Sequence, residues 1–143
     1  MNKRVLIAAG GLLFLAVIYI TSRSFFLTEP PDLIGRLDEQ EILFHKGTYV
    51  WTSGVADAPE PTELANQYER YEVTPETDII LSFSVQPSEY SAEQVTAAER
   101  ISLPIQDNKI RTPSEPGTYF IVVYGEWPAG TGTYVVKLKV NPK

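Results

Sequence analysis

Residues 116–140, PGTYFIVVYGEWPAGTGTYVVKLKV, decide the fold class of this chain. Tyr134, Val136, Leu138 and Val140 fall on one face of a strand, and Lys137 and Lys139 fall on the other, which is the period of a strand with one buried face. From 119 to 127, both alternating sets are apolar or aromatic, which predicts a central strand covered on both sides. The glycine-rich segment 128–132 predicts a hairpin loop between them, because glycine readily adopts the positive φ that such turns need.

Shorter strand patterns precede this hairpin. Residues 78–85 alternate with one apolar face, and residues 101–105 repeat that period before an Asp107-Asn108 turn. Short apolar runs separated by turn residues predict an all-β fold of about seven strands, built as a sandwich or a barrel.

Two segments fit this pattern less well. Residues 57–68 contain two prolines and predict a loop that holds one helical turn. Residues 91–100 combine good helix formers with Ser91 and Gln94 at capping-box spacing, which predicts one short helix.

The amino end predicts a signal anchor, a single transmembrane helix over residues 1–24. Lys3 and Arg4 precede the uncharged stretch 5–22, whose 18 residues would reach about 27 Å as a helix, close to the thickness of a bilayer core. Since only Arg23 follows that stretch, the positive-inside rule places the amino terminus in the cytoplasm and the rest of the chain outside. A cleavable secretory signal is the alternative, although no Ala-x-Ala cleavage site follows.

The part after the anchor divides into a linker and a domain. Residues 25–38 contain two adjacent prolines and little apolar periodicity, which predicts an extended linker. Residues 39–143 then form one extracytoplasmic β-sandwich domain. Residues 24–143 carry 9 basic and 18 acidic side chains, so anionic lipid headgroups repel this part of the chain.

Composition excludes several kinds of chemistry. The chain has no cysteine, so it forms no disulfide, thiolate metal site or thiol nucleophile, and its net charge of −6 argues against a nucleic-acid partner. The single histidine, His45, lies in a strand pattern without a nucleophile motif, so we expect no catalytic residue, no cofactor and no enzyme activity. Acidic loops at 57–63 and 76–78 could supply oxygen ligands to calcium, but they lack the Asp-x-Asp-x-Asp-Gly spacing, which favours a solvated acidic surface without metal.

Three segments carry a family resemblance: GTYVW at 47–51, DAPEP at 57–61, and the Pro-Gly-x-Tyr hairpin from 116 to 140. Together they resemble uncharacterised exported or membrane-anchored immunoglobulin-like β-sandwich domains of Gram-positive, bacillus-type bacteria. This chain lacks the lipid-bearing cysteine of the lipoprotein members, which leaves the hydrophobic helix as its anchor. The resemblance implies a β-sandwich outside the cell membrane and assigns no activity.

Tyrosine and tryptophan side chains are abundant in the expected domain. We expect Trp51 and Trp127 to pack in the core. Tyr68, Tyr71 and Tyr90 lie outside the clearest strands, so we expect them to be exposed and to form a candidate binding surface. The sequence therefore predicts a protein-binding accessory module of the cell envelope. The alternative is a cell-wall or polysaccharide-binding module, in which exposed aromatic side chains stack on sugar rings.

Overall fold

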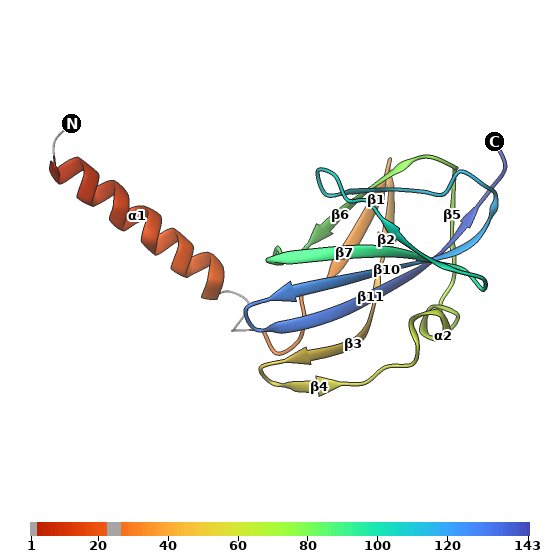
Figure 1. The fold of residues 1–143 in the computed structure, drawn as a ribbon, viewed down its shortest axis with the longest axis horizontal. Helices are drawn as coiled ribbons and strands as arrows, with labels where there is room; N and C mark the ends of the chain where they lie inside the picture. Colours follow the sequence, from red (N-terminus) through yellow and green to blue (C-terminus); the bar gives the residue numbers. More distant parts are fainter. Residues whose placement is uncertain (1–2, 23–26) are drawn as a thin grey trace.

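The computed structural model describes residues 3–22 and 27–143, and within the first helix it describes the side chains of 10–19. Helix α1, Lys3–Ser22, stands apart from the strands in Figure 1. Within the described residues, no helix combines the length and the apolar character that a membrane crossing requires. The predicted anchor, 1–24, includes residues 1, 2, 23 and 24, which lie outside the described residues, so the anchor stays a prediction.

The described residues contain eleven strands in two sheets, so the all-β prediction is confirmed (Figure 1). The smaller sheet has the strand order β2-β1-β6-β9, and the larger has the order β4-β3-β11-β10-β7-β8. All pairings are antiparallel except that of β5, which pairs in parallel with β11. The two sheets bury one core cluster and form a β-sandwich.

The strands outnumber the expected seven because several have only three or four residues, too few to show a period in the sequence. Their bounds are β1 Leu33–Leu37, β2 Gln40–Leu43, β3 His45–Trp51, β4 Gly54–Ala56, β5 Tyr71–Val73, β6 Asp78–Phe83, β7 Glu89–Val95, β8 Arg100–Leu103, β9 Lys109–Arg111, β10 Gly117–Trp127 and β11 Gly130–Val140.

The β10–β11 hairpin forms the centre of the larger sheet. Its register pairs Trp127 with Gly130 at the tip. Successive residues of β10 face opposite sides, and both sides are covered, since Val123 is buried between the sheets and Val122 is buried on the outer face. The prediction of a central strand covered on both sides is confirmed.

The hairpin turn is tighter than the predicted loop 128–132, because β11 already begins at Gly130. Gly130 has a φ of +153°, and a Cβ there would lie 2.0 Å from the Val50 carbonyl oxygen. Gly132 lies inside the strand, and its missing side chain leaves room for Pro30, 2.9 Å from where a Cβ would stand. The first glycine therefore serves both the turn and the approach of β3, and the second serves packing.

Aromatic rings occupy the core between the sheets. Trp127 lies edge-on to Trp51, Phe83 and Tyr134, with ring centroids 5.7, 5.5 and 6.4 Å away. Both tryptophans are only 4% exposed, so the prediction that they belong to the core is confirmed. Neither indole is free to stack on a sugar.

A second, smaller core covers part of the outer face of the larger sheet. Helix α2, Pro61–Ala65, buries Leu64 in a cluster with Val122 and Val135. Proline suits the first turn of a helix, where its missing N–H costs no hydrogen bond. The helical turn predicted within 57–68 is therefore confirmed.

The short helix predicted over 91–100 is wrong. This stretch forms β7 and the start of β8, joined by a turn in which Thr96 Oγ1 accepts a hydrogen bond from the Glu99 N–H at 3.2 Å. Ala92 is buried in the core and pairs with Val123 of β10. Strand neighbours on both sides of β7 outweigh the local preference of its residues for a helix.

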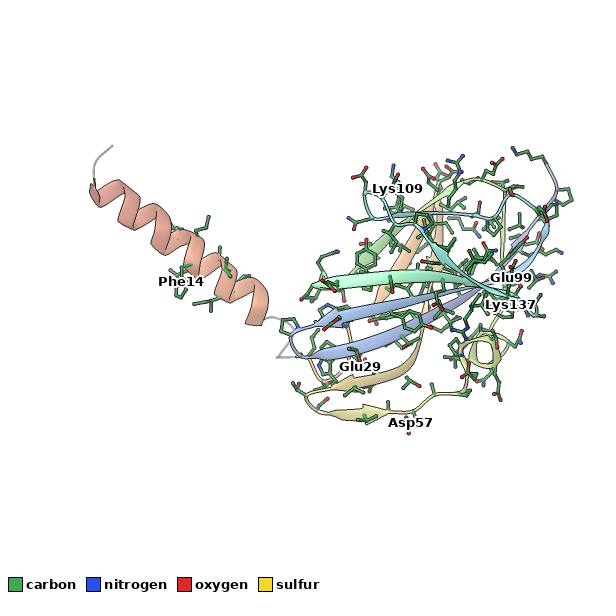
Figure 2. All side chains as sticks on the ribbon, in the orientation of Figure 1. Phe14, Glu29, Asp57, Glu99, Lys109 and Lys137 are labelled. Atoms are coloured by element: carbon green, nitrogen blue, oxygen red, sulfur yellow. The ribbon has the colours of Figure 1, made fainter. Side chains whose placement is uncertain are left out.

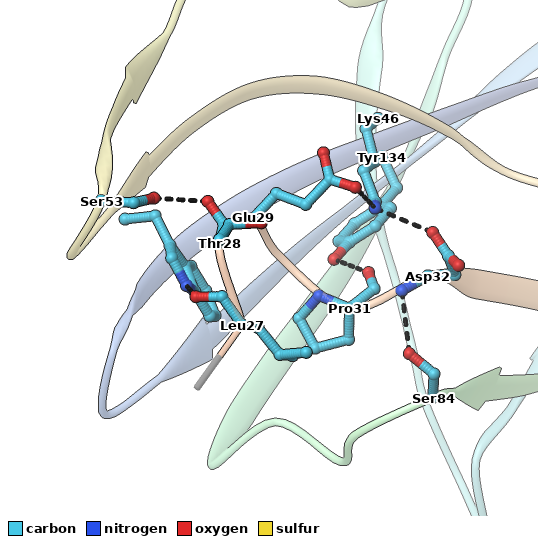
Figure 3. Close-up of polar contacts among 10 residues, drawn as sticks. Leu27, Thr28, Glu29, Pro31, Asp32, Lys46, Ser53, Ser84 and Tyr134 are labelled. Atoms are coloured by element: carbon cyan, nitrogen blue, oxygen red, sulfur yellow. Dashed lines mark hydrogen bonds and ion pairs between the residues drawn. The ribbon is translucent and has the colours of Figure 1, made fainter. Parts of the chain in front are cut away.

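The predicted linker, residues 25–38, differs most from the structure. Strand β1 lies within it, in the middle of the smaller sheet, and Leu33 is fully buried. Residues Leu27–Asp32, which we call the strap, bind along the end of the sandwich through the polar contacts drawn in Figure 3. The folded domain therefore includes the strap and β1, because tertiary contacts fix residues that carry almost no strand pattern of their own.

Candidate functional site

A hollow of about 480 Å³ opens beside the segment that joins α2 to β5. Two of the three tyrosines that the sequence singled out lie in it, so we call it the tyrosine hollow. Its lining residues are Gln40, His45, Tyr68, Glu69, Arg70, Tyr71 and Glu72.

Tyr68 is held in the hollow by a ring contact with His45 of β3. The two rings lie nearly parallel, 8° apart, with their centroids 3.5 Å from each other. Tyr68 remains 45% exposed, so one face of its ring is supported and much of the rest meets solvent. Burial lowers the pKa of His45, which keeps the imidazole neutral at physiological pH. The pair is thus a preorganised aromatic surface.

Tyr71 forms the floor of the same hollow. It begins β5, pairs with Leu138 of β11 and is half-buried against the main core. Its hydroxyl accepts a hydrogen bond of 3.1 Å from the Leu43 N–H on the open edge of β2. Beside it, Arg70 and Glu72 form an exposed ion pair of 3.7 Å, which contributes little to stability but gives the rim both signs of charge.

Tyr90 does not join this hollow. It lies on β7 opposite Gly125, near the hairpin tip, whereas Tyr71 lies at the level of Leu138 at the far end of β11. Its ring packs edge-on against Phe83 with a centroid separation of 5.2 Å, and burial raises the pKa of its hydroxyl. The structure therefore brings Tyr68 and Tyr71 together and separates Tyr90 from them, and the binding role of all three stays a prediction.

A second hollow crosses the outer face of the larger sheet beside α2. Two adjoining cavities of about 210 and 350 Å³ share Tyr124 and Thr133, and we call them together the outer groove. Arg100 donates to Glu93 Oε2 at 3.1 Å and to the Tyr124 hydroxyl at 3.2 Å, and its guanidinium lies 3.8 Å from Glu60. Burial, and after it the nearby Glu93 carboxylate, raise the pKa of Tyr124.

Sequence reasoning did not identify the outer groove, although Tyr90, which it singled out, lines the larger of its two cavities. The sequence placed Tyr124 in the predicted central strand and Arg100 at the end of the helix predicted over 91–100, and it gave no reason to expect a contact between them. They meet because β7 lies between β10 and β8, which no local pattern reveals. The outward position of Tyr124 in the alternation of β10 was an available signal.

Neither hollow presents an arrangement of metal ligands. Across the residues that the structure describes, no three histidine, aspartate or glutamate side chains gather as a group that could hold a metal ion. No protein-family model, curated protein or solved structure matches this chain. The geometry of the two hollows therefore carries the functional argument.

Proposed function

We propose that this protein is a membrane-anchored, extracytoplasmic binding module that contacts another envelope protein through the tyrosine hollow. The supporting observation is the exposed ring of Tyr68, which is stacked on His45 beside Tyr71. A rigid tyrosine offers a large contact area and loses little conformational entropy on binding. A rim with both signs of charge, from Arg70 and Glu72, suits a polypeptide partner.

The proposed fold is immunoglobulin-like. Strands β1, β6 and β9 lie adjacent as do strands A, B and E of that fold, and β8, β7, β10 and β11 lie in the order C′, C, F and G. The hydroxyl of Tyr119, near the start of β10, donates to the Glu115 carbonyl at 2.9 Å. This contact matches the tyrosine corner that marks the turn into strand F of immunoglobulin-like domains.

The proposed anchor is the apolar helix at the amino end. The sequence from 5 to 22 contains no charged residue, while Lys3 and Arg4 precede it and one arginine follows it. This distribution supports a cytoplasmic amino terminus and an outer β-sandwich. The proposal therefore places the tyrosine hollow outside the cell membrane, where an envelope protein could reach it.

Site-specific photo-crosslinking tests the protein-binding role. The full chain, carrying a photo-reactive phenylalanine in place of Tyr68, is expressed in its native membrane, irradiated, and its adducts are identified. A matched chain carries the same group in place of Val55, which is exposed on β4. We expect one membrane or secreted protein to be captured from position 68 and not from position 55. Equal adduct patterns from both positions would refute the tyrosine hollow as the docking surface.

A second candidate function is glycan binding in the outer groove. The observation that favours it is the Tyr124 ring, which lies among hydroxyl and carboxylate groups that suit a polyhydroxylated ligand (Thr133, Ser91, Glu93, Glu126). Isolated wall glycan should retain the full chain, and Tyr124→Ala should abolish that retention while Tyr68→Ala leaves it intact. Retention that survives Tyr124→Ala would exclude this groove as the glycan site.

A further inference from the structure

The strap fixes the point at which the anchor meets the β-sandwich. Trp51 Nε1 donates to the Leu27 carbonyl at 2.9 Å, and Ser53 Oγ donates to the Thr28 carbonyl. The Tyr134 hydroxyl donates to the Pro31 carbonyl at 2.6 Å in a fully buried position. The backbone of the strap is therefore held at Leu27, Thr28 and Pro31, as Figure 3 shows.

Charged side chains secure the same segment. Lys46 Nζ lies 3.2 Å from Glu29 and 2.8 Å from Asp32, and the Asp32 N–H donates to Ser84 Oγ at 3.0 Å. Pro30 and Pro31 are both buried and, as prolines, have little freedom to rotate. A segment fixed by buried prolines, ion pairs and backbone hydrogen bonds does not behave as a swinging linker.

The strap begins at one particular end of the sandwich. Trp51, which holds Leu27, pairs with Gly130 at the hairpin tip. The loop between β6 and β7 lies at the same end, because the Ser88 N–H donates a hydrogen bond of 2.7 Å to the Glu126 carbonyl. We call this the hairpin end. In Figure 2, Glu29 lies toward α1, while Glu99 and Lys137 lie toward the opposite end.

The chain between helix and strap is short. Four residues, 23–26, separate Ser22 from Leu27, so the two ends cannot lie more than about 18 Å apart even with a fully extended chain. An anchor that leaves the bilayer at Ser22 therefore holds the hairpin end within that distance of the lipid surface.

We infer that the hairpin end of the sandwich faces the bilayer, so that the tyrosine hollow is presented on the side remote from it. The inference rests on the proposed function, because it takes α1 to be a membrane anchor. His45, on which Tyr68 is stacked, pairs with Val135, and Tyr71 pairs with Leu138, five and eight residues along β11 from Gly130. The hollow therefore lies about 17–27 Å along the strand from the hairpin tip. The partner that fits is a protein of the same membrane whose outer part rises to that height.

Charge at the hairpin end indicates that the tether, not adhesion, sets this orientation. Four segments build this end of the sandwich: residues 27–32, 51–56, 84–90 and 125–133. They contain no lysine or arginine, and their four carboxylates are those of Glu29, Asp32, Glu89 and Glu126. Lys46, which reaches the strap from β3, is engaged by two of these carboxylates. This surface therefore does not bind anionic headgroups, and high salt should not abolish the orientation.

Energy transfer to a labelled bilayer tests the inference, and the absence of cysteine makes single labelling clean. The full chain carries a donor dye at Ser88→Cys, at the hairpin end, or at Glu69→Cys, in the hollow. The chain is reconstituted in vesicles of phosphatidylcholine and phosphatidylglycerol with acceptor-labelled headgroups. We expect transfer several-fold higher from position 88 than from position 69, at low and at high salt.

A matched control isolates the tether. A flexible Gly-Ser segment inserted between residues 26 and 27 leaves the strap contacts intact and should bring transfer from the two positions close together. Flotation of the same samples separates the two ways of failing. A chain that does not float with vesicles refutes both the anchor and the inference. A chain that floats but shows equal transfer from positions 88 and 69 without the insertion refutes the inference alone.

Discussion

Replacing Tyr134 by phenylalanine tests the attachment of the strap to the core. The ring of Tyr134 is fully buried against Phe83 and Trp127, so Tyr134→Phe keeps the packing and removes only the hydroxyl. Its hydrogen bond to the Pro31 carbonyl is lost, and that buried acceptor is left without its partner. We expect the free energy of unfolding at neutral pH to fall by about 1–2 kcal/mol.

The same substitution should change how stability depends on alkaline pH. Burial, and after it the carboxylates of Asp32 and Glu29, hold the pKa of Tyr134 well above its ordinary value near 10. Above that pH the unfolded chain loses the phenolic proton while the folded chain keeps it, so folding stability falls as pH rises. One pH unit above 10, this cost amounts to about 1.4 kcal/mol. The variant has no such proton, so the difference between wild type and variant should nearly vanish there.

Urea titration of the full chain measures both effects, with the fluorescence of the two buried tryptophans as the signal. Comparison of the two proteins at each pH cancels the contributions of Tyr90 and Tyr124, whose pKa values are also raised and which both proteins retain. A stability difference that stays constant from neutral pH to pH 11 would refute the assignment of a buried, protonated hydroxyl to Tyr134. An unchanged urea midpoint at neutral pH would refute the contribution of the strap contact.

Three further changes have defined outcomes. Gly130→Ala should lower the free energy of unfolding, measured by thermal unfolding, by about 3 kcal/mol or more, because the added Cβ meets backbone. Gly54→Ala is the control: Gly54 has a similar φ of +151° but open space around it, so its loss should be clearly smaller. Equal losses would show that backbone strain alone is at work. Burial lowers the pKa of His45, so on acidification the unfolded chain takes up this proton before the folded chain does, and stability falls between about pH 7 and pH 5. His45→Gln should reduce that fall, which urea midpoints at the two pH values measure. An identical acid dependence in both proteins would contradict the prediction. Lys46→Ala should lower the free energy of unfolding by less than about 1 kcal/mol, and this loss should shrink at high salt, because the lysine is partly exposed. A large loss that salt does not change would mean that its ion pairs are effectively buried.

Local alternation was sufficient to predict the hairpin and the burial of the tryptophans. In the last residues of β11 burial alternates from one residue to the next, and in β10 both faces are apolar because both are covered, so the sequence pattern records burial directly. The same reasoning failed at β7, where Ala92 and its neighbours prefer a helix in isolation but pair with strands on both sides. It also failed at β1, whose buried Leu33 follows two prolines that suggested a linker.

The candidate site was predictable only in part. Exposure of Tyr68 followed from its position outside the clear strands, and the structure places Tyr71 beside it. The stack of Tyr68 on His45 joins residues 23 positions apart, and the contact between Arg100 and Tyr124 joins residues 24 apart. Such contacts depend on which strands become neighbours, and no single segment of the sequence holds that information.

By itself, the sequence determined the all-β class, the central hairpin and the two indoles of the core, because hydrophobic burial acts on each strand separately and imprints its period there. Only the tertiary structure decided that residues 27–37 belong to the domain and that Tyr90 stands apart from the tyrosine hollow. The physical reason is that the strap makes no regular hydrogen-bond ladder of its own. It is ordered by Trp51, Ser53, Lys46 and Tyr134, which the sheets must first bring together.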